Sequence, residues 1–248
     1  FRKKFKNPYA VVHRGDLHGV LLQACKSSKF IKLQTNSMVI DYEQDENNVS
    51  AILHNHENIK GSALIGAEGL WSNIRQRLVG DGRPNVSGHT TYRSVIPTND
   101  MPEDLRWNSA TLWAGPKCHI VHYPLSDWKS FNLVVTYHND AKEPIAGKSV
   151  TKDVVSKGFE HINPVPRQII ERGKNWKSWV LCDREPVLDW VDGKVALLGD
   201  AAHPMLQYLA QGACMAIEDA VCLSDEMSKG FDKVETALLN YQNRRRVR

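Results

Sequence analysis

The 248-residue chain lacks a Cys-x-x-Cys pair, a long hydrophobic run and an internal repeat. Its five cysteines are an odd number and no two are spaced as Cys-x-x-Cys, which disfavours a disulfide framework and a zinc site. No apolar run approaches the ~18–20 residues of a membrane-spanning helix, and the first residues lack the apolar stretch of a signal peptide. We therefore expect a cytoplasmic protein without a metal site or a membrane anchor.

Strong charge of one sign is also missing. The formal net charge is +4, and part of it lies in the end segments "FRKKFK" and "RRRVR". Aromatic residues do not interleave with these basic residues in the way typical of RNA-binding modules, so we interpret both segments as solvated surface and expect no nucleic-acid partner. The length suits one large domain or two modest ones.

Two stretches share one order of features: a buried strand, a glycine, an acid and a helix. In the first, Ala63–Ile65 predicts a short strand, Gly66–Gly69 a tight turn and Ser72 the N-cap of a helix. In the second, Leu197–Gly199 closes a strand and Asp200 follows it. Two such units are typical of an α/β sheet in which the carboxyl ends of neighbouring strands face one ligand. We therefore expect an α/β sheet.

Alternating strands dominate the region between these two units. The stretches "TYRSVIP", "ATLWAG", "CHIVHYPL" and "FNLVVTYH" predict strands, "KDVVSKGFEHI" a helix and "NPVPRQ" a Pro-rich turn. Nearer the N-terminus, Asp16–Cys25 predicts a helix capped by Asp16, and residues 30–55 predict a hairpin or meander that turns at "EQDENN". The pattern indicates a mostly antiparallel sheet inserted into an α/β domain.

The predicted helix after Gly212 has an apolar face with helical spacing. Its members are Ala213, Ala216, Ile217, Ala220 and Val221. We expect this face to be packed, with Cys214 and Cys222 on or near it, and Glu218 and Asp219 on the opposite side. The free N–H groups at Gly212 and Ala213 favour negative charge. An ordinary helix after a long loop is the alternative interpretation.

Three motifs in order resemble class A, single-component flavoprotein aromatic hydroxylases, which have the p-hydroxybenzoate hydroxylase fold. "GDAAHP…AQGA…AIEDA" resembles their flavin-binding signature, "GAEGLWSNIR" their second signature and "HRGDLHGVLLQAC" their Arg-x-x-Leu helix. The resemblance covers nearly the whole chain. It implies a Rossmann-like FAD-binding domain, residues 1–83 and 186–248, with an inserted β-sheet substrate domain, residues 84–185.

Two features depart from the family pattern. No Gly-x-Gly-x-x-Gly occurs in this sequence, so we expect a fragment whose FAD-binding domain is incomplete at its N-terminus. Glu68 stands where the family usually has aspartate, and its extra methylene displaces the carboxylate.

The resemblance also implies roles for individual residues. Asp200 binds the ribityl or nearby phosphate region of FAD, Arg14 contacts FAD from its helix, and the N–H groups of Gly212 and Ala213 face the pyrimidine end of the ring. His203 and Pro204 shape the side of the ring that reacts with oxygen. The implied cofactor-binding set is Arg14, Glu68, Gly199, Asp200, Pro204, Gly212 and Ala213.

The implied reaction uses FAD, O₂ and either NADH or NADPH to hydroxylate a small aromatic carboxylic acid. "CHIVHYPL", "CDREP" and "PMLQYLAQGACMAIEDA" resemble family members that convert 3-hydroxybenzoate to 2,5-dihydroxybenzoate. Salicylate and 6-hydroxynicotinate are alternative substrates. The same residues are also compatible with a catalytically incomplete flavin-binding fragment or with an unrelated α/β binding protein, and the sequence leaves open a homodimer.

The stretch "HIVHY" predicts the substrate site. Strand alternation puts His119, Val121 and Tyr123 on one face, with His119 and Tyr123 roughly 13 Å apart. His119 suits the proton acceptor for a phenol because histidine has a reference pKa near ~6.5. Tyr123 and Gln207 suit hydrogen bonds to the carboxylate or phenolic oxygen, and Tyr92 and Arg93 suit the border of the pocket. A structural sheet histidine is the alternative for His119.

Overall fold

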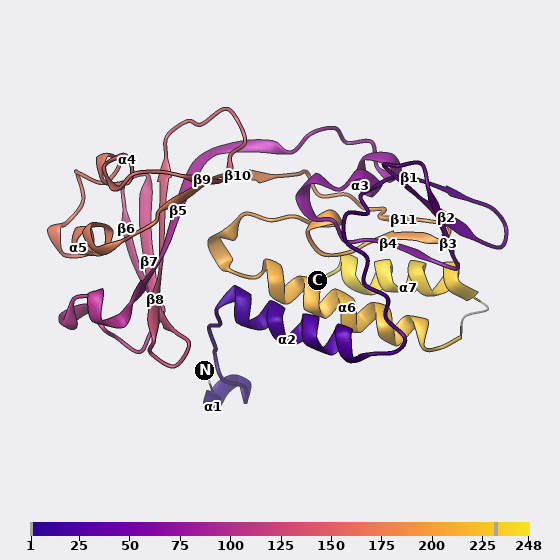
Figure 1. The fold of residues 1–248 in the computed structure, drawn as a ribbon, viewed down its shortest axis with the longest axis horizontal. Helices are drawn as coiled ribbons and strands as arrows, with labels where there is room; N and C mark the ends of the chain where they lie inside the picture. Colours follow the sequence, from indigo (N-terminus) through magenta and orange to yellow (C-terminus); the bar gives the residue numbers. More distant parts are fainter. Residues whose placement is uncertain (1, 231–232) are drawn as a thin grey trace. The chain divides into compact units, whose positions relative to one another are not determined.

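The computed structural model describes residues 2–230 and 233–248, which divide into two compact units. The sheet unit contains Phe1–Leu33 and Val86–Leu181, and the α/β unit contains Gln34–Asn85 and Cys182–Arg248 (Figure 1). Within the described residues, no helix has the length and apolar character needed to cross a bilayer. Residues 1–33 group with the sheet unit, so the predicted assignment of residues 1–83 to an FAD-binding domain stays a prediction.

A six-stranded sheet forms the centre of the sheet unit. In spatial order its strands are β6 (Thr111–Gly115), β7 (Cys118–Leu125), β8 (Ser130–His138), β5 (Asn85–Pro97), β10 (Lys177–Asp183) and β9 (Ala146–Ser149). The pairs β6–β7, β7–β8, β8–β5 and β10–β9 are antiparallel. The four predicted strand stretches of this region are therefore confirmed.

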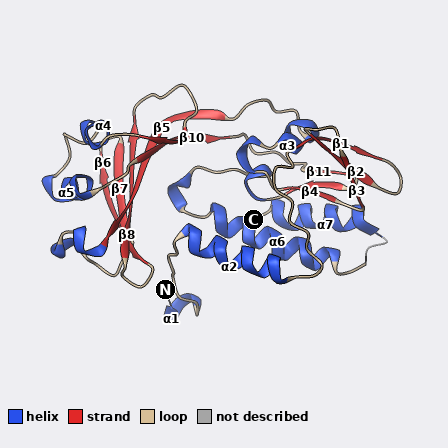
Figure 2. Cartoon of the chain, in the orientation of Figure 1, coloured by secondary structure: helices blue, strands red, loops and turns tan. Residues whose placement is uncertain are grey.

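Helices α4 (Lys152–Lys157) and α5 (Pro164–Arg172) cover one face of this sheet (Figures 1 and 2). Phe131, Leu133 and Val135 alternate along β8 and are fully buried against Val155 and Ile169 of the two helices. Each such side chain contributes about 1.5–3 kcal/mol by leaving water. The opposite face of the sheet has no such helical cover within the sheet unit's core cluster.

The Pro-rich turn predicted at "NPVPRQ" is wrong, because these residues begin α5. The side chain of Asn163 accepts a hydrogen bond from the N–H of Val165, and Pro164 occupies the first turn, where a missing N–H does no harm. The preceding helix, α4, ends at Lys157, before the end of the predicted helix, and Gly158 is its C-cap.

The N-terminal segment carries α1 (Arg2–Phe5) and α2 (Arg14–Ser27). The prediction that Asp16 caps α2 is wrong. The helix begins at Arg14, two residues before Asp16, and His13 is its N-cap. Asp16 instead lies in the first turn, where a carboxylate is favoured by the helix dipole, and accepts a hydrogen bond from Ser126 Oγ at 3.0 Å.

The α/β unit contains two small sheets. One is an antiparallel meander of β1 (Val39–Gln44), β2 (Val49–Leu53) and β3 (Asn58–Gly61). The β1–β2 pair confirms the two strands predicted on either side of "EQDENN", whereas residues 30–38 form no strand and β3 follows the predicted segment. The other has the order β11 (Val191–Asp192), β12 (Val195–Leu197) and β4 (Leu64–Gly66). Because β12 and β4 are parallel, their carboxyl ends lie at the same edge. The predicted fold class, an α/β domain with an inserted antiparallel sheet, is confirmed.

Helices α3 (Asn73–Leu78), α6 (Gly212–Met227) and α7 (Val234–Arg246) complete the α/β unit. Ser72 caps α3 as predicted, because its Oγ accepts a hydrogen bond from Arg75 N at 2.9 Å. Cys222 of α6 packs with Leu238 and Tyr241 of α7 and with Ala196 of β12. This cluster holds the two long helices against the parallel strands.

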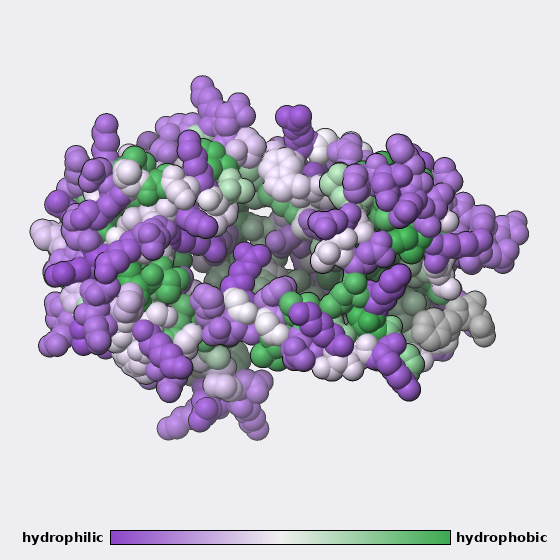
Figure 3. All heavy atoms as spheres, in the orientation of Figure 1, coloured by the Kyte–Doolittle hydropathy of each residue, from purple (hydrophilic) through white to green (hydrophobic). Residues whose placement is uncertain are grey.

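The predicted orientation of α6 is wrong. Ile217 and Val221, from the expected packed face, are 48% and 66% exposed, whereas Asp219 is fully buried. Cys214 is exposed and only Cys222, of the two cysteines, is buried. The helix turns its acidic side inward because α7 supplies an arginine partner there. Figure 3 shows hydrophobic side chains lying at the surface between hydrophilic ones.

Candidate functional site

The open face of the six-stranded sheet, defined as the face opposite α4 and α5, carries the predicted substrate residues. Along β7, Cys118, Ile120 and His122 are buried under the helices, whereas His119, Val121 and Tyr123 are partly exposed on the open face. The predicted alternation is therefore confirmed.

Cross-strand pairing arranges the open face in rows. One row contains His119, Thr136 and Thr91; the next contains Val121, Val134 and Arg93; the third contains Tyr123, Asn132 and Val95. The hydroxyls of Thr91 and Thr136 lie 2.9 Å apart, which shows that β5 and β8 present these residues to the same face. The open face thus has polar groups on either side of a row that contains two valines and the charged side chain of Arg93.

Burial sets the protonation states of the two predicted catalytic side chains. It lowers the pKa of His119, and the neighbouring His89 lowers it further, so the imidazole is neutral at pH 7. Burial raises the pKa of Tyr123, although the Arg93 guanidinium and a hydrogen bond with Asn132 oppose this. His119 is therefore available as a proton acceptor, and Tyr123 as a hydrogen-bond donor.

His122 lies on the other side of the same strand and cannot share the site of His119. It is fully buried, and within the described part of the chain neither ring nitrogen has a hydrogen-bond partner. Its ring stacks on Trp113, with centroids 6.3 Å apart, and also contacts Trp107 and Phe131. Burial lowers its pKa to about 4, which makes it a neutral core residue.

In the α/β unit, the loop after β12 places Gly199 and Asp200 beside the start of α6. Gly199 has φ +61°, and a Cβ there would lie 3.1 Å from Ala216 Cβ. Its N–H donates to Asp219 Oδ2 at 2.9 Å. Only glycine combines this left-handed conformation with so close an approach to α6. The glycine therefore fixes where the carboxylate of Asp200 stands.

The N-terminus of α6 remains open beside Asp200. Gln211 at the N-cap makes no side-chain hydrogen bond to the helix. A Cβ at Gly212 would lie 3.7 Å from Asp200 Oδ1, so the exposed carboxylate stands next to the first turn. These residues fit the flavin implied by the sequence, since a carboxylate suits ribityl hydroxyls and the N–H groups of Gly212 and Ala213 suit an anionic ring edge.

A buried network around Asp219 fixes the loop between β12 and α6. Asp219 Oδ2 lies 2.6 Å from His203 Nε2, and Asp219 Oδ1 accepts from Arg245 Nε at 2.6 Å. Burial raises the pKa of the Asp219 carboxyl, but the hydrogen bonds from His203 and Gly199 outweigh it and the pKa is lowered. Asp219 belongs to the motif "AIEDA", but the helical spacing of the apolar residues in α6 predicted that it faces solvent.

Arg75 is a second residue that the sequence analysis did not single out. Its side chain is completely buried and its Nη1 donates to the carbonyl oxygens of Ala201 and Ala202, at 3.1 and 2.7 Å. Its Nη2 pairs with Asp81 at 2.7 Å. Arg75, the arginine of "SNIR", therefore ties the two strand–glycine–acid–helix units to each other.

The remaining predicted residues have less direct geometry. Both Glu68 oxygens serve α3, accepting from Ser72 Oγ at 2.7 Å and from Ile74 N at 3.1 Å. Pro204 and Gln207 are half-buried in the loop before α6, and Arg14 is exposed at the start of α2. Roles for these residues toward a cofactor or substrate stay predictions.

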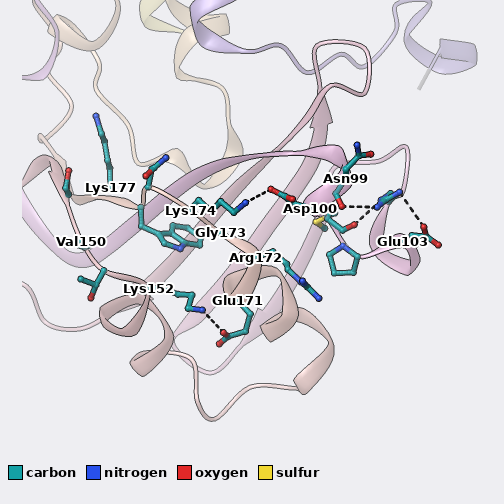
Figure 4. A pocket seen from close by; sticks show the side chains of 17 residues that line it. Asn99, Asp100, Glu103, Val150, Lys152, Glu171, Arg172, Gly173, Lys174 and Lys177 are labelled. Carbon is teal, nitrogen blue, oxygen red and sulfur yellow. Dashed lines mark hydrogen bonds and ion pairs between the residues drawn. The ribbon is translucent and has the colours of Figure 1, made fainter.

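A hollow of about 1010 Å³ in the sheet unit is lined by none of the predicted site residues (Figure 4). Several of its charged side chains pair with one another: Lys174 Nζ lies 2.7 Å from Asp100 Oδ2, and Lys152 Nζ lies 3.2 Å from Glu171 Oε2.

Comparison with known proteins gives consistent matches. The profile of the FAD binding domain family matches residues 5–248. The chain is 56% identical over 248 residues to 3-hydroxybenzoate 6-hydroxylase 1 of Aquipseudomonas alcaligenes, covering all of this chain and 63% of that protein. It is 43% identical to 3-hydroxybenzoate 6-hydroxylase of Polaromonas naphthalenivorans (strain CJ2), covering all of this chain and 62% of that protein.

Among solved structures, a salicylate hydroxylase substrate complex has the same fold, with a TM-score of 0.82 at 22% identity. That match covers 95% of this chain and 62% of the other. The chain thus spans a little under two thirds of the length of these proteins.

Proposed function

Because the chain belongs to the FAD binding domain family, we propose that it is part of an FAD-dependent monooxygenase that hydroxylates 3-hydroxybenzoate para to its phenol. The similarity over all 248 residues to a 3-hydroxybenzoate 6-hydroxylase carries this proposal. The balanced reaction takes 3-hydroxybenzoate, O₂, a proton and NADH or NADPH, and gives 2,5-dihydroxybenzoate, water and the oxidised nicotinamide.

The α/β unit supplies the flavin-binding groups in this proposal. Bound FAD supplies the redox chemistry that connects the reductant to O₂. Asp200 would accept hydrogen bonds from the ribityl hydroxyls of FAD, and the N–H groups of Gly212 and Ala213 would face its pyrimidine edge. The positive end of α6 would stabilise negative charge there. Arg14, Glu68 and Pro204 are assigned to the same cofactor.

The sheet unit supplies the groups that act on the aromatic acid. His119 accepts the phenol proton at a ring nitrogen, because its imidazole is neutral at pH 7. The resulting phenolate pushes electron density onto the para carbon, where the oxygen is added. Tyr123 and Gln207 orient the acid through hydrogen bonds, with Tyr123 protonated because burial raises its pKa.

A flavin spectrum and a product analysis on the whole protein test this function. We expect a bound flavin band that shifts on addition of 3-hydroxybenzoate, and 2,5-dihydroxybenzoate as the product after NADH or NADPH is supplied. A protein that binds flavin but makes no 2,5-dihydroxybenzoate from this acid would overturn the substrate assignment. The same flavin titration on residues 1–248 alone tests the incomplete-fragment alternative.

Salicylate is the second candidate substrate, favoured by the fold shared with a salicylate hydroxylase, and 6-hydroxynicotinate is the third. Turnover of a panel of the three acids, followed by mass spectrometry of the products, separates them. A cytoplasmic location and a homodimer belong to the same proposal. Light scattering of the purified whole protein tests the dimer.

A further inference from the structure

A second group of titratable side chains lies on the open face beside His119. His89 of β5 pairs with His138 of β8 in the antiparallel register, one row along from the row that contains His119. Alternation puts both histidines on the open face, because each lies two positions from a threonine of that row. His89, His138 and the nearby acid Asp140 are called the histidine cluster below.

A ring contact and an ion pair connect the members of the histidine cluster. The rings of His89 and His138 meet edge to face, with centroids 4.4 Å apart. His138 Nε2 lies 3.3 Å from Asp140 Oδ1, and the side chain of this acid is 78% exposed. Gly88 makes room for the arrangement, because its φ is +77° and a Cβ there would lie 3.2 Å from His138 Nε2. The cluster therefore leads from the sheet face to a carboxylate in water.

Both charge and hydroxyl groups connect His119 to the histidine cluster. His89 lowers the pKa of His119, so the two rings are close enough for their charges to interact. Thr136 lies opposite His119 across the strands, and the hydroxyl of Thr91 lies 2.9 Å from that of Thr136. A hydroxyl both donates and accepts hydrogen bonds, which is what a group that passes on a proton must do. Groups of this kind thus occupy the face between His119 and His89.

A proton placed on His119 needs a way out. Burial lowers the pKa of His119, so its imidazolium is more acidic than that of a free histidine and releases a proton readily at pH 7. Burial and the neighbouring His138 also lower the pKa of His89, whereas the Asp140 carboxylate opposes them. Both His119 and His89 are therefore neutral at rest and able to accept a proton. The negative charge of Asp140 favours positive charge at the solvent end of the cluster.

We propose that the proton taken from the substrate phenol leaves His119 through the two threonine hydroxyls and the histidine cluster, and enters water beside Asp140. The phenol O–H bond breaks as an N–H bond forms on His119. Each later transfer breaks one N–H or O–H bond and forms the next, and no electrons are exchanged. The product again carries a phenol O–H, so the same groups carry a proton back when turnover ends. The inference rests on the proposed function, whose base it connects to solvent.

Two substitutions of His89 in the whole FAD-bound protein test the inference. His89→Ala leaves room for free imidazole, whereas His89→Phe fills the space with a ring that carries no proton. Reduced protein that holds 3-hydroxybenzoate is mixed with O₂, and formation of 2,5-dihydroxybenzoate is followed in a single turnover with and without added imidazole. The control is His161→Phe, since His161 is exposed between α4 and α5, which cover the opposite face.

We expect both His89 variants to slow this single turnover by about 10- to 100-fold, less than loss of the base itself, because water partly replaces a side chain that only passes the proton on. Added imidazole should restore most of the rate of His89→Ala and none of the rate of His89→Phe. A purely structural role for His89 would give no such difference. The control should match wild type, and the Kd for the acid, from the shift of the flavin spectrum, should be unchanged in every variant.

Two results overturn the inference alone: a wild-type rate in both His89 variants, or a slow His89→Ala that imidazole does not restore. Where a His89 variant fails to bind the acid, His138→Ala provides the same imidazole test one step further from His119. The proposed function stands in these cases, because wild type still makes the product. Wild-type protein that makes no 2,5-dihydroxybenzoate overturns the proposed function together with the inference.

Discussion

The buried histidine of β7 makes the sheet unit sensitive to acid. His122 has no exposed surface and, within the described residues, no hydrogen-bond partner for either ring nitrogen. Its pKa is about 4 in the folded chain, against 6.5 for an unperturbed histidine. The unfolded chain therefore binds a proton on this residue in a pH range where the folded chain does not.

The sign and the size follow from proton linkage. Above about pH 8 both states are neutral and this residue contributes no pH dependence. As the pH falls through 6.5 the unfolded state gains the proton, and the penalty on folding reaches roughly 2 kcal/mol at pH 5 and roughly 3 kcal/mol below pH 4. His122→Phe removes the titrating group and keeps an aromatic ring beside Trp113.

Urea unfolding at pH 8 and pH 5, followed by tryptophan fluorescence, measures the effect. We expect the free-energy difference between His122→Phe and wild type to widen by roughly 2 kcal/mol in favour of the variant between these pH values. His18→Phe makes the same change at an exposed position of α2 and should show no such widening. A difference that stays constant with pH would refute the reasoning.

Three further changes test the two candidate sites. His119→Gln in the whole protein should lower kcat/KM for 3-hydroxybenzoate by about 10²–10⁴-fold and remove the acid limb of the pH–rate profile. An unaltered pH–rate profile would contradict the role of His119 as the base. Arg75→Met should lower the free energy of unfolding of the α/β unit by about 1–3 kcal/mol in urea, because the buried carbonyl oxygens of Ala201 and Ala202 lose their donor and Asp81 keeps only its ion pair with Arg184. Gly199→Ala should destabilise the same unit by about 1–2 kcal/mol and weaken flavin retention, since its Cβ meets Ala216 in a left-handed backbone; unchanged flavin content after gel filtration argues against that role.

Local patterns in the sequence determined much of the fold. The alternation of β7, the cap at Ser72 and the pairing of β1 with β2 all depend on residues a few positions apart, and all are confirmed. Three ordered motifs identified the FAD-binding family, which is confirmed as well. The substrate, the reductant and the roles of His119, Tyr123 and Gln207 stay predictions.

Tertiary structure decided which polar side chains are buried. Spacing put Asp219 in solvent, but Arg245, 26 positions later, pairs with it in the core, because a carboxylate enters the interior when charged and hydrogen-bonded partners compensate its lost hydration. Arg75 reaches the carbonyl oxygen of Ala201 across 126 positions, and the strand order β7–β8–β5 brings Arg93 onto the face of Tyr123. Sequence periodicity reports the side on which a residue lies, whereas its partner is set by chain segments that only folding brings together.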